Sequence, residues 1–371
     1  MSKEMSFTSC SHEHGPTVEK SLPMILNAYA VLSGFVVVLR GIAAVLVIGL
    51  ACCVLRSRRR VEFSPTERTE SENRFYLLSL LSTWLLGLSL ISWPLLYLLL
   101  QSYVPHWPGV MCIYGVTQIG AGSRGYSRFL PGLIVALQFL KPAAVFVSGV
   151  WWLLYRIQRQ TQTEPLMGRI LLVQLGFGVL ALTDTLLEGV YLVIPKREEF
   201  LFTGCCTSDI SYQSDRSISW LASLSDGLGP KWLSFTFYVV NFGLVFALWC
   251  FRIRSRQFEK SPGMNLLLLG AVLVAPLTAA YLAEIAAPAV LRLPYHHCLY
   301  DLIPRAIDMV LGIVLYVMGA GCVGWACAVR WLAVRPETKD LARSDQDWLL
   351  SVGLNCYVAA LVMFFLEVSL A

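Results

Sequence analysis

The sequence contains few charged residues. Only 14% of its 371 residues are charged, whereas 56% are hydrophobic. Soluble domains carry nearer a quarter charged residues, so this composition excludes an ordinary soluble protein. The net charge of +5 is scattered over short loops. A nucleic-acid partner would require that charge to be gathered on a water-facing domain, so nucleic acid is not expected.

Several motifs of known chemistry are also missing. No histidine falls in a long apolar run. Haem inside a helix bundle commonly needs histidine as an axial ligand, so haem is not expected there. There is no phosphate-binding glycine loop suited to a cytoplasmic nucleotide, no pair of Cys-x-x-Cys words and no His-Glu-x-x-His. The Asp-Arg-Tyr and Asn-Pro-x-x-Tyr words of seven-helix receptors are absent as well. No motif connects the chain to a family.

Long apolar runs are what the sequence does contain. A helix needs about 20 apolar residues to cross a bilayer, and each run should be helical because hydrocarbon offers no water to its peptide groups. The sequence therefore predicts an all-α integral membrane protein, a bundle of about eight transmembrane helices. We expect a polar tail over 1–23 and one polytopic domain over 24–371. The predicted spans are 30–55, 75–104, 132–155, 170–194, 232–251, 266–287, 309–329 and 349–370.

Basic residues predict the orientation of these spans. Lysine and arginine are enriched in cytoplasmic loops. Four alternate loops hold most of them here: Arg56, Arg58, Arg59, Arg60, Arg68 and Arg74; Arg156, Arg159 and Arg169; Arg252, Arg254, Arg256 and Lys260; Arg330, Arg335, Lys339 and Arg343. Both termini are thus expected on the outer, periplasmic side. The compact chain suggests a multi-pass protein of a bacterial inner membrane.

Cysteine and histidine gather in the loops assigned to the outer side. All five histidines are there, and three cysteines, Cys112, Cys205 and Cys298, recur at equal intervals in those loops. Thiolate and imidazole bind soft metals such as copper or zinc. The candidate metal ligands are Cys112, Cys205, Cys206, His296, His297 and Cys298. Disulfides are the alternative, because outer loops face an oxidising compartment.

The equal spacing of the three cysteines suggests an internal repeat. Two of them lie in similar words, Met-Cys-Ile-Tyr-Gly around Cys112 and His-Cys-Leu-Tyr-Asp around Cys298. Repeated two-helix units would explain this period, and coincidence would explain it equally well.

Ionisable residues inside the apolar runs form a second candidate site. Such residues are costly in hydrocarbon and commonly line a cavity or pathway. Asp184 and Glu188 are four residues apart and share one helix face. Glu284 is expected at a similar depth, and Lys141 and Arg40 are expected to supply the opposing charge. An outward-open polar pocket is the functional interpretation, and side chains that reach the interface from helix ends are the alternative.

Three classes of function follow from these sites. The first is binding of a soft metal, or thiol-redox work, at the outer membrane face. The second is a non-catalytic membrane anchor subunit, held by disulfides, of a larger complex, such as one that carries electron-transfer proteins. The third is an ion or solute carrier that uses Asp184, Glu188 and Lys141. Whether the protein is an enzyme is left open by the sequence.

Overall fold

The computed structural model describes residues 27–58, 65–106, 110, 112–120, 125–161, 164–196, 229–253, 263–293 and 298–371. The predicted tail 1–23 lies outside these residues. Within them the chain is helical and has no strand. Eight of the helices in this described part of the chain are long and apolar enough to cross a membrane, which confirms a multi-pass helical membrane protein.

The eight long helices are α1 (Ala28–Arg58), α2 (Pro65–Tyr103), α4 (Leu130–Arg159), α5 (Met167–Val193), α7 (Gly229–Ile253), α8 (Gly263–Tyr281), α11 (Ile307–Leu332) and α12 (Lys339–Leu370). The α8 helix continues through a π-helical turn, η3 (Leu282–Ala286), into α9 (Ala287–Leu291). Shorter segments are η1 (Val104–His106), α3 (Ile113–Thr117), η2 (Tyr126–Phe129), η4 (Leu299–Asp301) and α10 (Leu302–Arg305).

Two helices begin well before their predicted spans. The α2 helix begins at Pro65 and α12 at Lys339, ahead of the predicted ranges 75–104 and 349–370. Their first turns are polar, with Glu70 and Arg74 forming an exposed ion pair in α2. Hydropathy detects the part of a helix that lies in hydrocarbon, so a polar extension into water escapes it.

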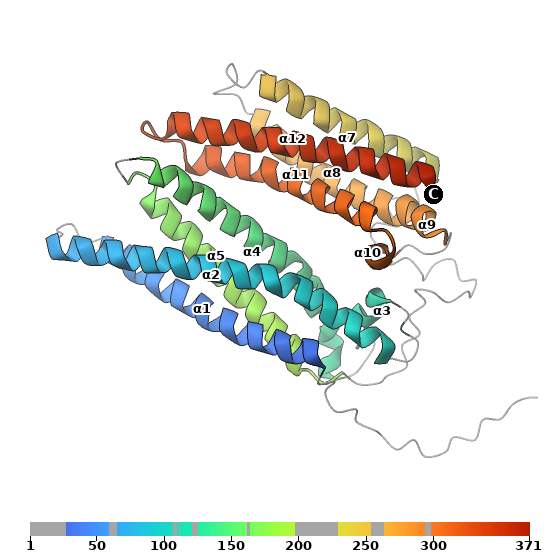
Figure 1. Cartoon of the computed structure of the whole chain (residues 1–371), viewed down its shortest axis with the longest axis horizontal. Helices are drawn as coiled ribbons and strands as arrows, with labels where there is room; N and C mark the ends of the chain where they lie inside the picture. The colour runs from blue at the N-terminus through green and yellow to red at the C-terminus, as the bar shows by residue number, and fades with distance from the viewer. Residues whose placement is uncertain are drawn as a thin grey trace, which may run out of the picture.

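The helices alternate in direction, so the two ends of the bundle differ. The connections after α1, α4, α7 and α11 share one end, which we call the arginine end because its described residues include Arg156, Arg169 and Arg330. The opposite end carries α3, α9 and α10 and is called the cysteine end, after Cys112 and Cys298 (Figure 1). The start of α1 and the end of α12 both lie there.

The bundle consists of two four-helix halves that lie side by side (Figure 1). Helices α1, α2, α4 and α5 form the N-terminal half, and α7, α8, α11 and α12 form the C-terminal half. In each half, two long helices are followed by a loop with short helical turns and then by two more long helices. Cys112 lies in this loop in the first half and Cys298 in the second, so the two cysteines occupy corresponding places.

The halves meet where α4 packs against α11, and glycine allows the close approach. A Cβ atom placed on Gly149 of α4 would lie 2.6 Å from the Trp325 ring of α11. In return, a Cβ on Gly324 would lie 2.8 Å from the Phe146 ring. The two rings stack with centroids 6.0 Å apart, and Trp325 Nε1 donates a 2.9 Å hydrogen bond to the Phe146 carbonyl. Each helix thus places a ring over the glycine of the other.

Candidate functional sites: a thiol pair and a buried charge network

The first candidate site is a pair of thiols at the cysteine end. Cys112 precedes α3 and Cys298 precedes η4, so each occupies the N-cap position of a short helical segment. Their Sγ atoms lie 3.8 Å apart, although 186 residues separate them in the sequence. Both side chains are buried, with 3% and 1% of their surface exposed. The pair therefore joins the N-terminal half of the bundle to the C-terminal half.

Asp301 adds a carboxylate to this pair. It follows Cys298 by three residues within the helical turn η4, and residues at this spacing lie on one side of such a turn. A carboxylate oxygen of Asp301 and the two sulfur atoms all lie within 4.8 Å of one another. Asp301 was not among the predicted ligands, and its only signal in the sequence is its place in the segment His-Cys-Leu-Tyr-Asp.

The separation of the sulfur atoms bears on their chemistry. A disulfide needs an S–S distance of about 2.05 Å, far shorter than the 3.8 Å between Cys112 and Cys298. Two thiolates about 2.3 Å from one tetrahedral zinc ion would lie about 3.8 Å apart. The observed spacing thus suits two sulfur ligands of a single metal ion.

Of the six predicted metal ligands, the structure brings together Cys112 and Cys298. The other four, Cys205, Cys206, His296 and His297, lie outside the described residues.

A half-buried tyrosine, Tyr300, borders the thiol pair. Burial and the neighbouring Cys298 raise the pKa of Tyr300 to about 12, so its phenol stays protonated at neutral pH. The amide of Gln138 in α4 donates a hydrogen bond to this hydroxyl. Because Tyr300 belongs to η4, this contact is a second link between the two halves at the cysteine end.

Lys196 is another unusual group at the cysteine end. Its ammonium lies 4.5 Å from the ring centroid of Tyr191 and donates a 3.0 Å hydrogen bond to the carbonyl of the same residue. Burial lowers its pKa to about 8.

We expect the acylation rate of Lys196 to level off above about pH 8, whereas that of a lysine model peptide rises until about pH 10.4. Peptide mapping after pulses of an amine-reactive reagent measures this, and a Lys196 rate that follows the model peptide would contradict it.

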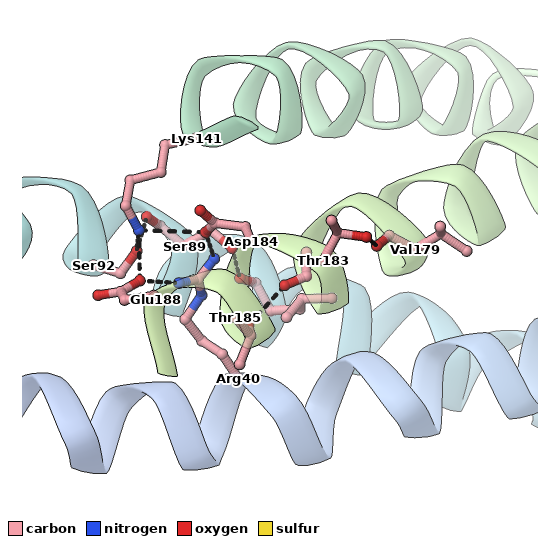
Figure 2. A network of polar contacts seen from close by, with 11 residues as sticks. Arg40, Ser89, Ser92, Lys141, Val179, Thr183, Asp184, Thr185 and Glu188 are labelled. Atoms are coloured by element: carbon pink, nitrogen blue, oxygen red, sulfur yellow. Dashed lines mark hydrogen bonds and ion pairs between the residues drawn. The ribbon is translucent and has the colours of Figure 1, made fainter. Parts of the chain in front are cut away.

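The second candidate site is a buried charge network between α1, α2, α4 and α5 (Figure 2). Arg40 pairs with both Asp184 and Glu188, the latter at 3.0 Å. Lys141 pairs with the same two carboxylates, at 3.3 Å and 2.6 Å. Its Nζ atom also donates a 3.0 Å hydrogen bond to Ser92 Oγ. Two cations and two carboxylates therefore alternate around a closed ring.

Each carboxylate uses only one of its oxygens in this ring. Oδ2 of Asp184 and Oε2 of Glu188 each contact both cations. The other oxygens, Oδ1 of Asp184 and Oε1 of Glu188, are buried and have no hydrogen-bond partner. Unpartnered buried oxygens are costly, so these two atoms can accept ligands that the protein itself does not supply.

The charge network is buried within the N-terminal half of the bundle. Arg40, Asp184 and Glu188 have no exposed surface, and Lys141 has 3%. Toward the cysteine end lies an apolar cluster from α2, α3 and α4 that includes Leu99, Ile113, Leu137 and, from α5, Tyr191. The predicted meeting of Lys141, Asp184 and Glu188 is thus observed, with the expected Arg40. The open pocket predicted around them was wrong, because α3 and its apolar neighbours fill that space.

Glu284 was predicted to share this polar site. It lies in the π-helical turn η3, in the C-terminal half, apart from the other three residues. The Ser92 hydroxyl, by contrast, was not predicted. A serine hydroxyl in a helix commonly donates to a backbone carbonyl of the preceding turn, as Ser89 does to Leu85. A serine within a helix therefore gives no indication in the sequence of a charged partner.

The C-terminal half holds its four helices with an uncharged counterpart. Tyr316 of α11 donates a 3.0 Å hydrogen bond to Asn241 of α7 and accepts one of 2.8 Å from Thr278 of α8. The Tyr316 ring also packs edge-on against Tyr357 of α12. These residues come from the four helices that correspond to α1, α2, α4 and α5. These four helices therefore meet at this point without a charged side chain.

Comparison with known proteins gives no assignment. The chain matches no family model, and neither the curated proteins nor the solved structures contain a match. The function must be argued from the two sites themselves.

Proposed function

We propose that this membrane protein binds a soft metal ion, of the copper or zinc class, through Cys112 and Cys298 at the outer membrane face. The observation that supports it is the pair of buried sulfur atoms 3.8 Å apart, contributed by two halves of the bundle. Thiolates are the preferred ligands of Cu(I) and suit zinc equally.

Further ligands are needed to complete such a site. The Asp301 carboxylate is near enough to complete a third position. His296 and His297 directly precede Cys298 in the sequence, and together with Cys205 and Cys206 they remain the candidates for a fourth. We assign the cysteine end to the outer side because the arginine-rich connections share the opposite end, and such loops are cytoplasmic in most membrane proteins.

Metal analysis of the purified chain tests this proposal. We expect about one copper or zinc ion per chain to survive dialysis, as a single closed site requires. The Cys112→Ser and Cys298→Ser variants should lose the ion, because a hydroxyl is a poor ligand for a soft metal. The matched control is Cys53→Ser, since Cys53 is exposed on α1 near the arginine end and should not affect the metal.

Two results would overturn the proposal. One is a metal content in Cys298→Ser equal to that of the unaltered chain. The other is peptide mapping without reductant that finds Cys112 and Cys298 joined in a stable disulfide. This second result would favour the disulfide-held anchor subunit over the metal site.

A further inference from the structure

The charge network has no part in metal binding at the thiols, and a four-helix half can also be joined by uncharged side chains. The uncharged Asn241, Thr278 and Tyr316 contacts serve the corresponding position of the C-terminal half. Burying four charges costs several kcal/mol per ion before their attraction is counted, and a neutral replacement is often no less stable. Charges kept at such a cost inside a membrane protein commonly mark an ion pathway or binding site.

The two cations of the network differ in one chemical respect. A guanidinium group is not deprotonated in proteins, so it offsets one carboxylate permanently. An ammonium group, in contrast, is an acid that can release its proton. The network is neutral with Lys141 charged, and it would carry one uncompensated negative charge with Lys141 neutral. One further monovalent cation would restore the balance.

The surroundings of the Lys141 ammonium suit such a cation. Three oxygens surround Nζ: Oδ2 of Asp184 at 3.3 Å, Oε2 of Glu188 at 2.6 Å and Oγ of Ser92 at 3.0 Å. Carboxylate and hydroxyl oxygens are ligands for hard cations. The unpartnered Oδ1 of Asp184 and Oε1 of Glu188 belong to the same two carboxylates. A bound ion would therefore find five oxygens on residues that already meet there.

We propose that the charge network is an exchange site, in which a monovalent alkali cation takes the position of the Lys141 ammonium as Lys141 releases a proton. One N–H bond of the ammonium breaks, its electron pair stays on Nζ, and the proton passes to water. One positive charge enters and one leaves, so the buried site stays neutral. The charged groups that face Lys141 are Asp184 and Glu188 of α5, with Arg40 of α1 bound to both.

Proton release from the purified full-length chain tests this exchange. Sodium chloride or potassium chloride is added to the protein in weakly buffered detergent, and the pH change is compared with that caused by choline chloride, whose cation is too large for the site. We expect release approaching one proton per chain with sodium, potassium or both, and the two salts identify the preferred ion. Ser92→Ala should raise the salt concentration needed for half of this release several-fold.

Lys141→Arg is the decisive variant, because it keeps the positive charge but not the releasable proton. It should release no proton in response to either salt while eluting as a folded monodisperse protein; Lys141→Met should also release none.

The control Thr278→Val alters the uncharged counterpart and should release as many protons as the unaltered chain. The Cys112→Ser variant should do so too, which separates this test from that of metal binding. Absence of salt-dependent release from the unaltered chain, or equal release from Lys141→Arg, would overturn the proposal.

Discussion

Replacing Arg40 with methionine is expected to lower the free energy of unfolding by about 3–5 kcal/mol, the usual cost of removing one partner from a buried ion pair. Arg40 contacts both Asp184 and Glu188 within a site that has no exposed surface. Without it, two carboxylates would share the single charge of Lys141. Denaturant unfolding in detergent, followed by the fluorescence of the chain's tryptophans, measures the loss.

A surface arginine provides the control for this experiment. Arg74→Met removes an exposed helical ion pair with Glu70, which is worth at most about 0.5 kcal/mol. The double variant Arg40→Met/Asp184→Leu restores one cation to one carboxylate and should lose less stability than Arg40→Met alone. If Arg40→Met cost no more than Arg74→Met, the network would not be the tightly paired site described above.

The spans and much of the charge network were predictable from the sequence because burial in hydrocarbon constrains both. An uninterrupted apolar run has few alternatives to a spanning helix, and a charge within it needs a partner. Asp184 and Glu188 could be placed on one face from their spacing alone. Their pairing with both Arg40 and Lys141 depends on how four helices pack, which no spacing reveals.

The closure of this site could not be predicted for a similar reason. Helix α3 has only five residues and lacks the apolar length that marks a spanning helix. Ile113 within it is buried by packing in a cluster with residues of α2 and α4. A short segment of this kind is positioned by its tertiary contacts. An open pocket was therefore predicted from the sequence where the structure has a packed cluster.

The similar sequence segments around Cys112 and Cys298 suggested that these two cysteines are related. The structure gives that likeness a physical basis, because Cys112 and Cys298 lie in corresponding loops of the two four-helix halves and their sulfur atoms meet. Asp301 was not predicted, since an acidic residue in a water-exposed loop is common and carries no signal of a partner. The sequence could suggest which loops resemble each other, but the 3.8 Å approach depends on how the halves pack.

That packing leads to the second large effect, at Gly149. Gly149→Ala is expected to lower the free energy of unfolding by about 1–3 kcal/mol, as overpacking of a close contact does. The added methyl group would meet the Trp325 ring at 2.6 Å, and the ring cannot withdraw without losing its hydrogen bond to the Phe146 carbonyl. The same unfolding measurement in detergent applies.

Gly176 is the matched control for Gly149, since it lies within the long helix α5 and has open space where a Cβ would be. Gly176→Ala should leave stability unchanged or raise it by up to about 1 kcal/mol, because alanine favours a helix. In a Trp325→Ala background, Gly149→Ala should then cost little, because the obstructing ring is gone. An equal cost in both backgrounds would mean that the α4–α11 contact does not hold the halves together in this way.

Because α4 also carries Lys141 and Gln138, a shift of this helix would reach both candidate sites. Gly149→Ala should therefore weaken metal retention and proton release together.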